Sequence, residues 1–571
     1  MGPSSAQRGE TAMDATHPWT RSYAPGVPAE IAEPDGSLVD LLTDAAGRFG
    51  PRVALDFYGA TTTFTELADQ VTRAAEALRR LGVSPGDRVA LVLPNCPQHV
   101  VAFYAVLRLG AVVVEHNPLY TADELDRQLT DHGAEVAIVW DRIAPLVAGR
   151  GAVRTVVAVD LTAALPRLKR WALRLPLPKV RAARAAMTGP APGALSWSDL
   201  VAAAGGLPAT HPGPGVDDIA LLQYTGGTTG VPKGAVLTHR NLRANAAQGR
   251  AWVPGLRDGA ETVYAVLPLF HAYGLTLCLT FAVGIGATLV LFPRFDVDQV
   301  LDAARRRPPT FLPAVPPVYA RLATAARERG ADLTSIRYAI SGAMALPPAT
   351  VDLWEQVTGG LLVEGYGMTE TSPITLGNPV APTRRPGTVG VPFPSTEVRI
   401  VDPEDPTRDR PAGEAGELLV RGPQVFSGYW NRPDDTARVL LPDGWLRTGD
   451  IVTMDDDGFV TVVDRIKELI ITGGFNVYPS EVEEALRRVP GVVEAAAVGV
   501  PTADGEEVVA AVVLDVAVAG TPEAIRTACR AHLAGYKVPR RVVVVEDLPR
   551  SQIGKILRRE VRDRLLADSD G

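Results

Sequence analysis

The sequence predicts an α/β protein with a large N-terminal domain of layered α/β subdomains, a β-rich portion at the end of that domain, and a small α+β C-terminal domain. Helical and strand segments alternate over 66–140, which is typical of a largely parallel sheet covered by helices. Over 413–463 the pattern changes to short β-rich pieces separated by Gly, Pro and Asp, and a new alternation begins near Arg465. The 571 residues also exceed what one hydrophobic core normally supports, so more than one domain is expected.

The N-terminal alternation starts with a helix over 66–81, where apolar residues recur at helical spacing until Gly82. A strand is expected at 88–94. Helices over 98–109 and 123–132 are followed by strands at 111–115 and 135–140, and a glycine separates each helix from its strand.

The apolar run 275–292 approaches transmembrane length, but Gly284 and Gly286 divide it, so a buried helix, a turn and a strand are expected. Strands are expected at 416–420 and 458–464. The C-terminal unit is expected to contain strands at 468–472, 495–500 and 508–514 and a helix from Thr521. Its first helix opens with Pro479, and Ser480 with Glu483 is a capping-box candidate.

These segments predict three regions: a flexible N-terminal arm over 1–40, a large domain over 41–464 and a small domain over 465–571. The arm lacks the continuous apolar segment of a signal peptide. Cys96, Cys278 and Cys529 are isolated in sequence, so neither a disulfide framework nor a structural zinc site is indicated, and a cytoplasmic location is expected.

The charge distribution disfavours a nucleic-acid partner, because 57 basic and 65 acidic residues give a net charge of −8. One local exception is 161–198, which has no acidic residue and alternates Arg and Lys with Leu and Trp. This segment fits peripheral contact with an anionic membrane, and it fits a solvated loop equally well. Pro176 and Pro178 exclude one long helix there.

The most informative segment is YTGGTTGVPKGAVLTH at 224–239. Its glycines let the backbone approach phosphates, its threonines supply hydroxyls and Lys233 supplies a positive charge. It is not a Walker A loop, because no glycine stands five residues before a Gly-Lys-Ser/Thr. The alternative is a flexible Gly/Thr linker, which needs no internal lysine. The phosphate-binding candidates are Thr225, Gly226, Gly227, Thr228, Thr229, Gly230 and Lys233.

Further motifs follow in a fixed order: LPLFHAYGL at 267–275, SGAMALPP at 341–348, EGYGMTE at 364–370, GWLRTGD at 444–450, DRIKELIITGGFNVYPSEVE at 464–483 and PRSQIGKILRRE at 549–560. Together with 224–239 they resemble the adenylate-forming superfamily of acyl-CoA synthetases, luciferases and peptide-synthetase adenylation domains. NPLYTADEL at 117–125, GPQVFSGYWNRPDDT at 422–436 and LAGYKVPR at 533–540 look most like bacterial long-chain fatty-acid CoA ligases.

The resemblance implies that ATP and a medium- to long-chain fatty acid give acyl-AMP and pyrophosphate, and that coenzyme A then gives acyl-CoA and AMP. It implies catalytic roles for Lys555, Glu370 and Thr225, with Thr225 and Glu370 also holding Mg²⁺, and a small domain that moves about Lys467. The implied adenine and ribose site is Gly342, Ala343, Tyr366, Gly367, Met368, Thr369, Asp450 and Arg465. His271, Gly473 and Gly474 match positions at the acyl and CoA sites.

Alternatives remain within and beyond this family. FHAYGL and EGYGMTE also resemble 4-coumarate-type aryl-CoA ligases, although GFNVYP favours fatty acids. A carrier-loading adenylation domain is disfavoured, because no Asp near His271 is placed to hold an amino group. A nucleotide-binding regulatory relic is the non-enzymatic alternative. The presence of Lys233, Glu370 and Lys555 argues against it. A homodimer is compatible with the sequence.

Overall fold

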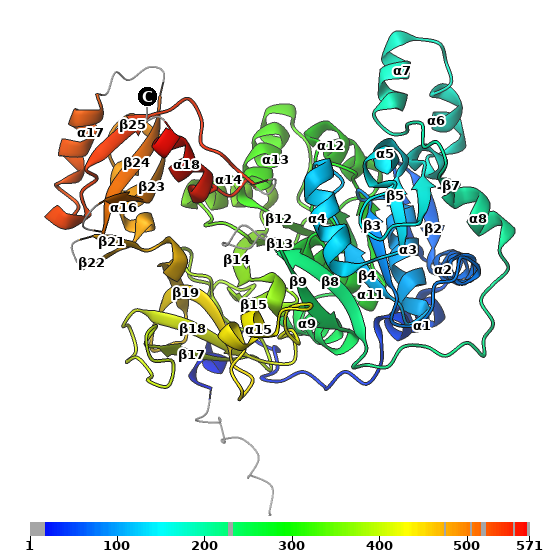
Figure 1. Ribbon diagram of the computed structural model, residues 1–571, viewed down its shortest axis with the longest axis horizontal. Helices are drawn as coiled ribbons and strands as arrows, with labels where there is room; N and C mark the ends of the chain where they lie inside the picture. The colour runs from blue at the N-terminus through cyan, green and yellow to red at the C-terminus, as the bar shows by residue number, and fades with distance from the viewer. Residues whose placement is uncertain are drawn as a thin grey trace, which may run out of the picture.

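The computed structural model describes residues 17–225, 232–472, 475–502, 505–515, 521–551 and 554–567. Figure 1 shows two large sheets surrounded by helices, a β-rich portion below them and a small C-terminal unit beside both. The α/β fold class with a small C-terminal α+β domain is confirmed.

The first large sheet is built from the predicted N-terminal alternation. Its described strands run in the order β7 (Leu195–Ser196), β6 (Thr155–Val159), β5 (Val136–Trp140), β3 (Arg88–Val92), β4 (Val112–Glu115), β8 (Ile219–Thr225) and β9 (Lys233–Thr238). All neighbours are parallel except the β8–β9 hairpin. One face packs with α2 (Phe64–Arg80) and α3 (Pro97–Arg108), and the other with α4 (Ala122–His132) and α5 (Ala144–Val147).

The predicted helix ends agree closely with the structure, and capping explains the differences. Helix α2 begins two residues before the predicted start because Thr63 and Glu66 form a reciprocal capping box. Helix α4 is capped in the same way by Thr121, and Gly133 ends it in the left-handed conformation with φ 64°.

The second large sheet carries most of the cavity described below. Its described strands run in the order β16 (Val391–Pro392), β15 (Ile374–Gly377), β14 (Leu361–Gly367), β13 (Tyr338–Ser341), β12 (Phe311–Ala314), β10 (Thr262–Ala265), β11 (Thr288–Leu291), β1 (Val53–Phe57) and β2 (Ala60–Thr63). The packed helices include α1 (Leu38–Phe49), α9 (His239–Trp252), α12 (Val297–Arg306), α13 (Pro316–Arg329) and α14 (Pro348–Thr358).

The apolar run 275–292 folds as predicted into buried helix, turn and strand. It continues α10 (Ala272–Gly274) through a π-helical stretch (Leu275–Thr280) and α11 (Phe281–Gly284), turns at Gly286 and enters β11. Within the described part of the chain, helices that combine membrane-spanning length with a sufficiently apolar composition are absent.

The N-terminal segment packs on the large domain from residue 17 onward, which the sequence did not predict. A 3₁₀ helix (Pro18–Ser22) buries Trp19 against Gly458, and Ser22 Oγ donates a 2.8 Å hydrogen bond to the Asp457 carbonyl. Tyr23 Oη donates to the Pro392 carbonyl at 2.7 Å. Residues 1–16 lie outside the described part of the chain.

The β-rich portion is an antiparallel sheet in the order β17 (Glu397–Val401), β18 (Gly416–Arg421), β19 (Leu446–Met454) and β20 (Val460–Arg465), flanked by α15 (Pro433–Val439). The strands expected at 416–420 and 458–464 correspond to β18 and β20. The pairing of Asp450 on β19 with Arg465 on β20 places two predicted site residues side by side.

The small C-terminal unit contains the hairpin β21 (Ile470–Thr472) and β22 (Phe475–Val477) and the sheet β23 (Val492–Thr502), β24 (Gly505–Leu514) and β25 (Arg541–Val544). Helices α16 (Pro479–Arg487) and α17 (Pro522–Cys529) cover one face of that sheet, and α18 (Arg558–Ala567) covers the other. Alternate residues of β23 enter the two apolar clusters, as expected for a strand buried on both sides.

The predicted capping box at the start of α16 is wrong. Pro479 occupies the first helical turn, so the N-cap is Tyr478, which makes no side-chain capping bond. Instead the Ser480 backbone N–H donates to Asp464 Oδ2 at 2.8 Å, and Glu483 accepts from Arg558 Nε at 2.7 Å. Ser480 therefore links the small unit to Asp464 of the large domain, and Glu483 binds α16 to Arg558 within the small unit.

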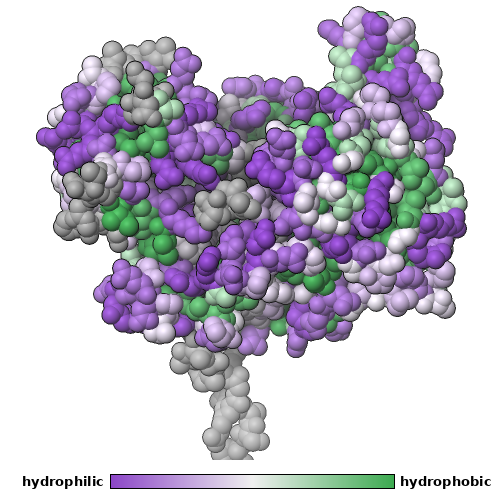
Figure 2. Space-filling model, in the orientation of Figure 1, coloured by the Kyte–Doolittle hydropathy of each residue, from purple (hydrophilic) through white to green (hydrophobic). Residues whose placement is uncertain are grey.

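The basic segment 161–198 contains two short helices, α6 (Arg167–Ala172) and α7 (Pro178–Ala185), and leads to α8 (Trp197–Ala203). As predicted, the helix is interrupted at Pro176 and Pro178. Figure 1 shows α6 and α7 projecting from the large domain, and Figure 2 shows apolar and hydrophilic residues intermixed on that projection. Leu168 is 83% exposed and Trp171 is 64% exposed.

Candidate active site

A cavity of about 660 Å³ lies where the large sheets, the β-rich portion and the small domain meet. Its walls include most of the predicted site residues: Thr225, Lys233, His271, Gly342, Ala343, Tyr366, Gly367, Met368, Thr369, Glu370, Arg465, Lys467 and Lys555. Asp450 is not on the wall but contacts two residues that are. Gly226, Gly227, Thr228, Thr229, Gly230, Gly473 and Gly474 lie outside the described residues.

The β8–β9 hairpin presents the two ends of the predicted phosphate loop to this cavity. Thr225 and Lys233 are paired across the hairpin, so a hydroxyl and an ammonium group lie side by side on the cavity wall. Lys233 Nζ lies 2.9 Å from Asp435 Oδ1 and 5.3 Å from the centroid of the Tyr429 ring. An anionic ligand must therefore compete with Asp435 for Lys233.

A buried polar network supports the hairpin from behind. Tyr224 Oη donates to Asp131 Oδ2 at 2.7 Å, and the Tyr224 ring stacks on His116 with centroids 6.0 Å apart. His116 Nδ1 lies 2.8 Å from Gln128 Oε1, and its Nε2 lies 3.1 Å from His132 Nε2. His132 Nδ1 accepts from the Ala134 N–H, so His132 donates through its Nε2, while His116 donates from Nδ1 to Gln128 and accepts at Nε2; both rings are neutral. Burial accordingly lowers the pKa of His116 to about 4.

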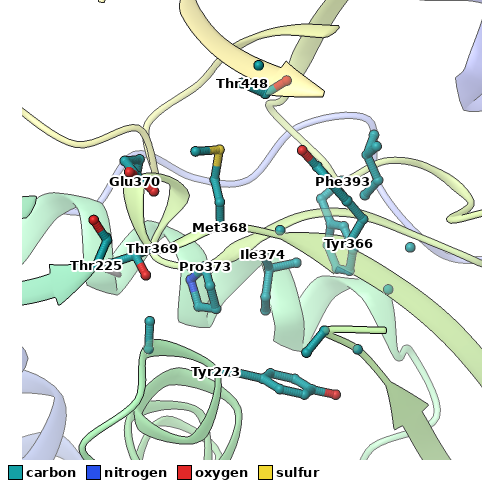
Figure 3. A pocket seen from close by; sticks show the side chains of 18 of the residues that line it. Thr225, Tyr273, Tyr366, Met368, Thr369, Glu370, Pro373, Ile374, Phe393 and Thr448 are labelled. Carbon is teal, nitrogen blue, oxygen red and sulfur yellow. The ribbon is translucent and has the colours of Figure 1, made fainter. Parts of the chain in front are cut away.

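Glu370 is a buried carboxylate on the cavity wall. Its Oε1 accepts a 2.6 Å hydrogen bond from Tyr429 Oη, and its pKa is raised by burial although this bond acts to lower it. Figure 3 shows Glu370 beside Thr225 and Thr369 on one side of the cavity. A carboxylate and a hydroxyl on one wall are oxygen donors of the kind that Mg²⁺ prefers, so the two residues fit such an ion.

Tyr366, Asp450 and Arg465 form a second polar group. Asp450 accepts a hydrogen bond from Tyr366 Oη and forms an ion pair with Arg465, whose Nε lies 2.8 Å from Asp450 Oδ1. Burial raises the pKa of Tyr366 well above its ordinary value, so the phenol stays protonated and donates. The Asp450 carboxylate is held in one orientation between the two domains.

The backbone beside Tyr366 leaves little space for side chains. A β-carbon at Gly342 would lie 3.1 Å from the Tyr273 ring, and one at Gly367 would lie 1.7 Å from the Pro373 carbonyl oxygen. Ala343 adopts a left-handed conformation with φ 70°. These positions form a flat wall of backbone that a planar ring can approach, which fits the predicted adenine site.

The small domain contributes Lys555 to the cavity. The loop that carries it is closed by hydrogen bonds between Ser551 and Lys555, and its Gly554 lies against Met344 of the large domain. The pKa of Lys555 is lowered by burial and by the positive charge of Arg465. Lys467, the predicted hinge residue, also lines the cavity.

One part of the cavity wall is apolar and was missed by the sequence analysis. It includes Gly249 and Trp252 of α9, Leu277, Ile374 and Phe393. Figure 3 shows Phe393 across the cavity from Thr225 and Glu370, with Ile374 and Pro373 between them. His271 borders this region, and its Nδ1 accepts a 3.2 Å hydrogen bond from the Tyr273 backbone N–H. Burial lowers the His271 pKa, which agrees with a neutral wall residue.

Partners of the predicted residues were also missed. Tyr429 lies within the motif quoted at 422–436, and Asp435 lies near its end, so the signal was present but no role was assigned. Arg447 and Thr448, which line the cavity inside GWLRTGD, are similar cases. Arg447 is held by a 2.9 Å hydrogen bond from its Nε to the buried Glu417.

Comparison with known proteins identifies the family. The model of the AMP-binding enzyme family matches residues 42–430, and that of the AMP-binding enzyme C-terminal domain matches 481–555. The chain belongs to the AMP-binding enzyme family. Thr225 and Glu370 lie within the first matched range, and Lys555 is the last residue of the second.

Relatives cover nearly the whole molecule. The chain is 39% identical over 564 residues to a long-chain-fatty-acid–CoA ligase of Bacillus subtilis (strain 168), covering 96% of this chain and 98% of the relative. It is 40% identical over 553 residues to a long-chain-fatty-acid–CoA ligase of Yersinia pestis, with 95% and 97% covered. A feruloyl-CoA synthase of Amycolatopsis sp. is 37% identical over 526 residues, with 90% and 97% covered.

A solved structure shows the same architecture. ATP-bound MatB from Rhodopseudomonas palustris superposes with a TM-score of 0.79 at 32% identity, covering 92% of this chain and 98% of MatB.

Proposed function

We propose that this protein is an AMP-forming ligase that activates a medium- to long-chain fatty acid with ATP and transfers the acyl group to coenzyme A. The observation that carries the proposal is a single cavity with charged residues at one side and an apolar wall at the other. The relatives named long-chain-fatty-acid–CoA ligases, similar over nearly their whole length, support the same reaction.

In the first half-reaction, a carboxylate oxygen of the acid attacks the α-phosphorus of ATP and pyrophosphate leaves. Lys555 is the cation that holds the attacking carboxylate and the α-phosphate together, where negative charge accumulates. Lys233 exchanges Asp435 for the leaving pyrophosphate. Thr225 and Glu370 would hold a Mg²⁺ ion, whose charge would offset that of the phosphates.

The nucleoside is held by the second polar group. The adenine ring lies against Tyr366 and the backbone at Gly342 and Gly367, while Asp450, held by its ion pair with Arg465, accepts hydrogen bonds from the ribose hydroxyls. In the second half-reaction, the thiol of coenzyme A attacks the acyl carbon and AMP leaves. The small domain turns about Lys467 between the two steps.

One panel tests this proposal: pyrophosphate release and coenzyme A consumption with acetate, octanoate, palmitate, oleate and 4-coumarate. We expect both signals with the longer fatty acids and little with acetate, because each methylene buried against the apolar wall makes binding more favourable. Preference for 4-coumarate would show that the substrate is an aryl acid rather than a fatty acid. Nucleotide binding without turnover of any acid would instead indicate a regulatory relic.

We also propose peripheral contact of α6 and α7 with an anionic membrane, from which a fatty acid would be drawn. The exposed Leu168 and Trp171 supply apolar side chains, and the seven basic residues of 161–198 supply positive charge. The test is cosedimentation at low salt with vesicles containing phosphatidylserine, compared with neutral vesicles. Equal recovery with both, or recovery unchanged in Trp171→Ala, contradicts this contact.

A further inference from the structure

The apolar wall of the cavity ends at two stacked aromatic rings. The Trp252 and Phe393 ring centroids are 4.3 Å apart at an interplanar angle of 31°. Trp252 is 1% exposed, and its Nε1 donates to the Asn378 carbonyl at 3.1 Å. This bond fixes the indole, because rotation of the ring would leave a buried N–H without its acceptor.

Behind this stack stands the N-terminal segment rather than solvent. The Tyr23 ring meets Trp252 edge to face, with centroids 5.2 Å apart and planes at 81°. Tyr23 Oη is anchored on the Pro392 carbonyl, the residue immediately before Phe393. Tyr23 thus contacts both the indole and the chain that carries the phenyl ring, while itself lying outside the described cavity wall.

The segment that carries Tyr23 is fastened on both sides of it. Trp19 is buried against Gly458, and Ser22 bonds the Asp457 carbonyl. Further along, the Ile31 N–H donates to Ser395 Oγ at 2.9 Å, and the Ser395 N–H donates to the Ala29 carbonyl at 3.0 Å. Residues 23–31 therefore bind the chain on both sides of Phe393, at Pro392 and at Ser395.

We propose that the Trp252–Phe393 stack is the floor that limits the acyl-chain length, and that Tyr23 of the N-terminal segment holds this floor in place. The inference rests on the proposed function, since it needs an acyl chain in the apolar part of the cavity. It makes Trp252 and Phe393 specificity-determining residues, and Tyr23 a positioning residue that acts through them.

Helix α9 also offers a substitution that should make the cavity smaller rather than larger. Gly249 lies three residues before Trp252 and also lines the cavity. A β-carbon there would lie 3.5 Å from Phe281 Cδ2 and 3.6 Å from Ile374 Cδ1, which is ordinary contact. Gly249→Ala should thus raise the thermal midpoint, because alanine is the better helix former, while it narrows the passage to the floor.

The experiment measures kcat/KM for hexanoate, decanoate, tetradecanoate and octadecanoate. In Trp252→Leu and Trp252→Ala we expect the longest acids to gain relative to the shortest, by about fourfold for each extra methylene that the enlarged cavity buries. Tyr23→Ala should shift the profile in the same direction by less, and Tyr23→Phe, which keeps the ring, should shift it least. Gly249→Ala should disfavour the longest acids.

Trp354 is the matched control. It is also fully buried and meets an aromatic ring, Tyr319, edge to face with centroids 4.8 Å apart, but it lies outside the described cavity wall. Trp354→Leu should lower stability without moving the chain-length profile. A profile unchanged in both Trp252→Leu and Tyr23→Ala, or an equal shift in Trp354→Leu, overturns the inference. If the unaltered protein turns over no fatty acid, the proposed function itself fails.

Discussion

Replacement of Lys555 by alanine is the most informative single change in the charged part of the cavity. Lys555 is carried by the small domain, yet it shares a cavity with Thr225 and Glu370 of the large domain. Its pKa is lowered, with burial as the first cause, so the ammonium stands in an environment less polar than bulk water. The variant removes this charge and, in our proposal, leaves nucleotide binding through Asp450 intact.

The size of the effect follows from that environment. At an effective dielectric constant of about 20, two unit charges ~4 Å apart interact by ~4 kcal/mol, which corresponds to roughly a thousandfold in rate. We therefore expect Lys555→Ala to slow acid-dependent pyrophosphate release by on the order of 10²–10³. Because its pKa is lowered, the unaltered enzyme should also lose adenylation on the alkaline side at a pH below 10.5, the ordinary lysine value, as Lys555 deprotonates.

The assay separates the two half-reactions. Pyrophosphate release reports adenylation, and conversion of supplied acyl-AMP to acyl-CoA reports thioester formation, which Lys555→Ala should spare. Lys537→Ala is the control, because Lys537 pairs with Glu481 at 2.7 Å in the same small domain and is not on the described cavity wall. An equal loss in both half-reactions, or an equal loss in Lys537→Ala, would refute the role of Lys555.

Other predictions concern the surroundings of the nucleotide. Tyr429→Phe removes the hydrogen bond to Glu370 and should raise the KM for Mg-ATP about tenfold and move the acid limb of activity to higher pH, because the pKa of Glu370 rises further; an unmoved limb contradicts this. Gly342→Leu should weaken ATP binding in calorimetry by roughly ten- to a hundredfold through overpacking against Tyr273, and unchanged affinity would exclude adenine from this wall. His116 alone should lower the unfolding free energy by about 3 kcal/mol between pH 6.5 and pH 4, because its imidazole takes up a proton in the unfolded chain but stays neutral in the folded one; a slope unchanged in His116→Gln contradicts this.

Local signals explain why much of the fold could be predicted. Helix α4 is bounded by Thr121 and Gly133, both of which act through their immediate neighbours, and its predicted limits differ from the structure by one residue. The division of 275–292 by glycines is similarly local. The capping box at Ser480 failed because the helix already begins at Pro479, and Glu483 binds Arg558, which lies 75 residues away in sequence.

The candidate site divides in the same way. Thr225, Glu370 and Lys555 could be proposed because each lies inside a contiguous motif, and the structure brings all three to one cavity. The role of Tyr429 as the partner of Glu370 could not be predicted, and neither could the aromatic floor of Trp252 and Phe393. Hydrogen bonds and ring contacts between distant segments leave no spacing pattern in the sequence. Tyr23 is the clearest example, since it reaches the floor from a segment that composition alone describes as an arm.

The most direct test of the proposed reaction is a single-turnover experiment with ATP and a fatty acid in the absence of coenzyme A. The geometry of one shared cavity predicts stoichiometric pyrophosphate and enzyme-bound acyl-AMP, followed by release of AMP and acyl-CoA when coenzyme A is added. Formation of ADP and phosphate, or pyrophosphate release that does not depend on the acid, would contradict it.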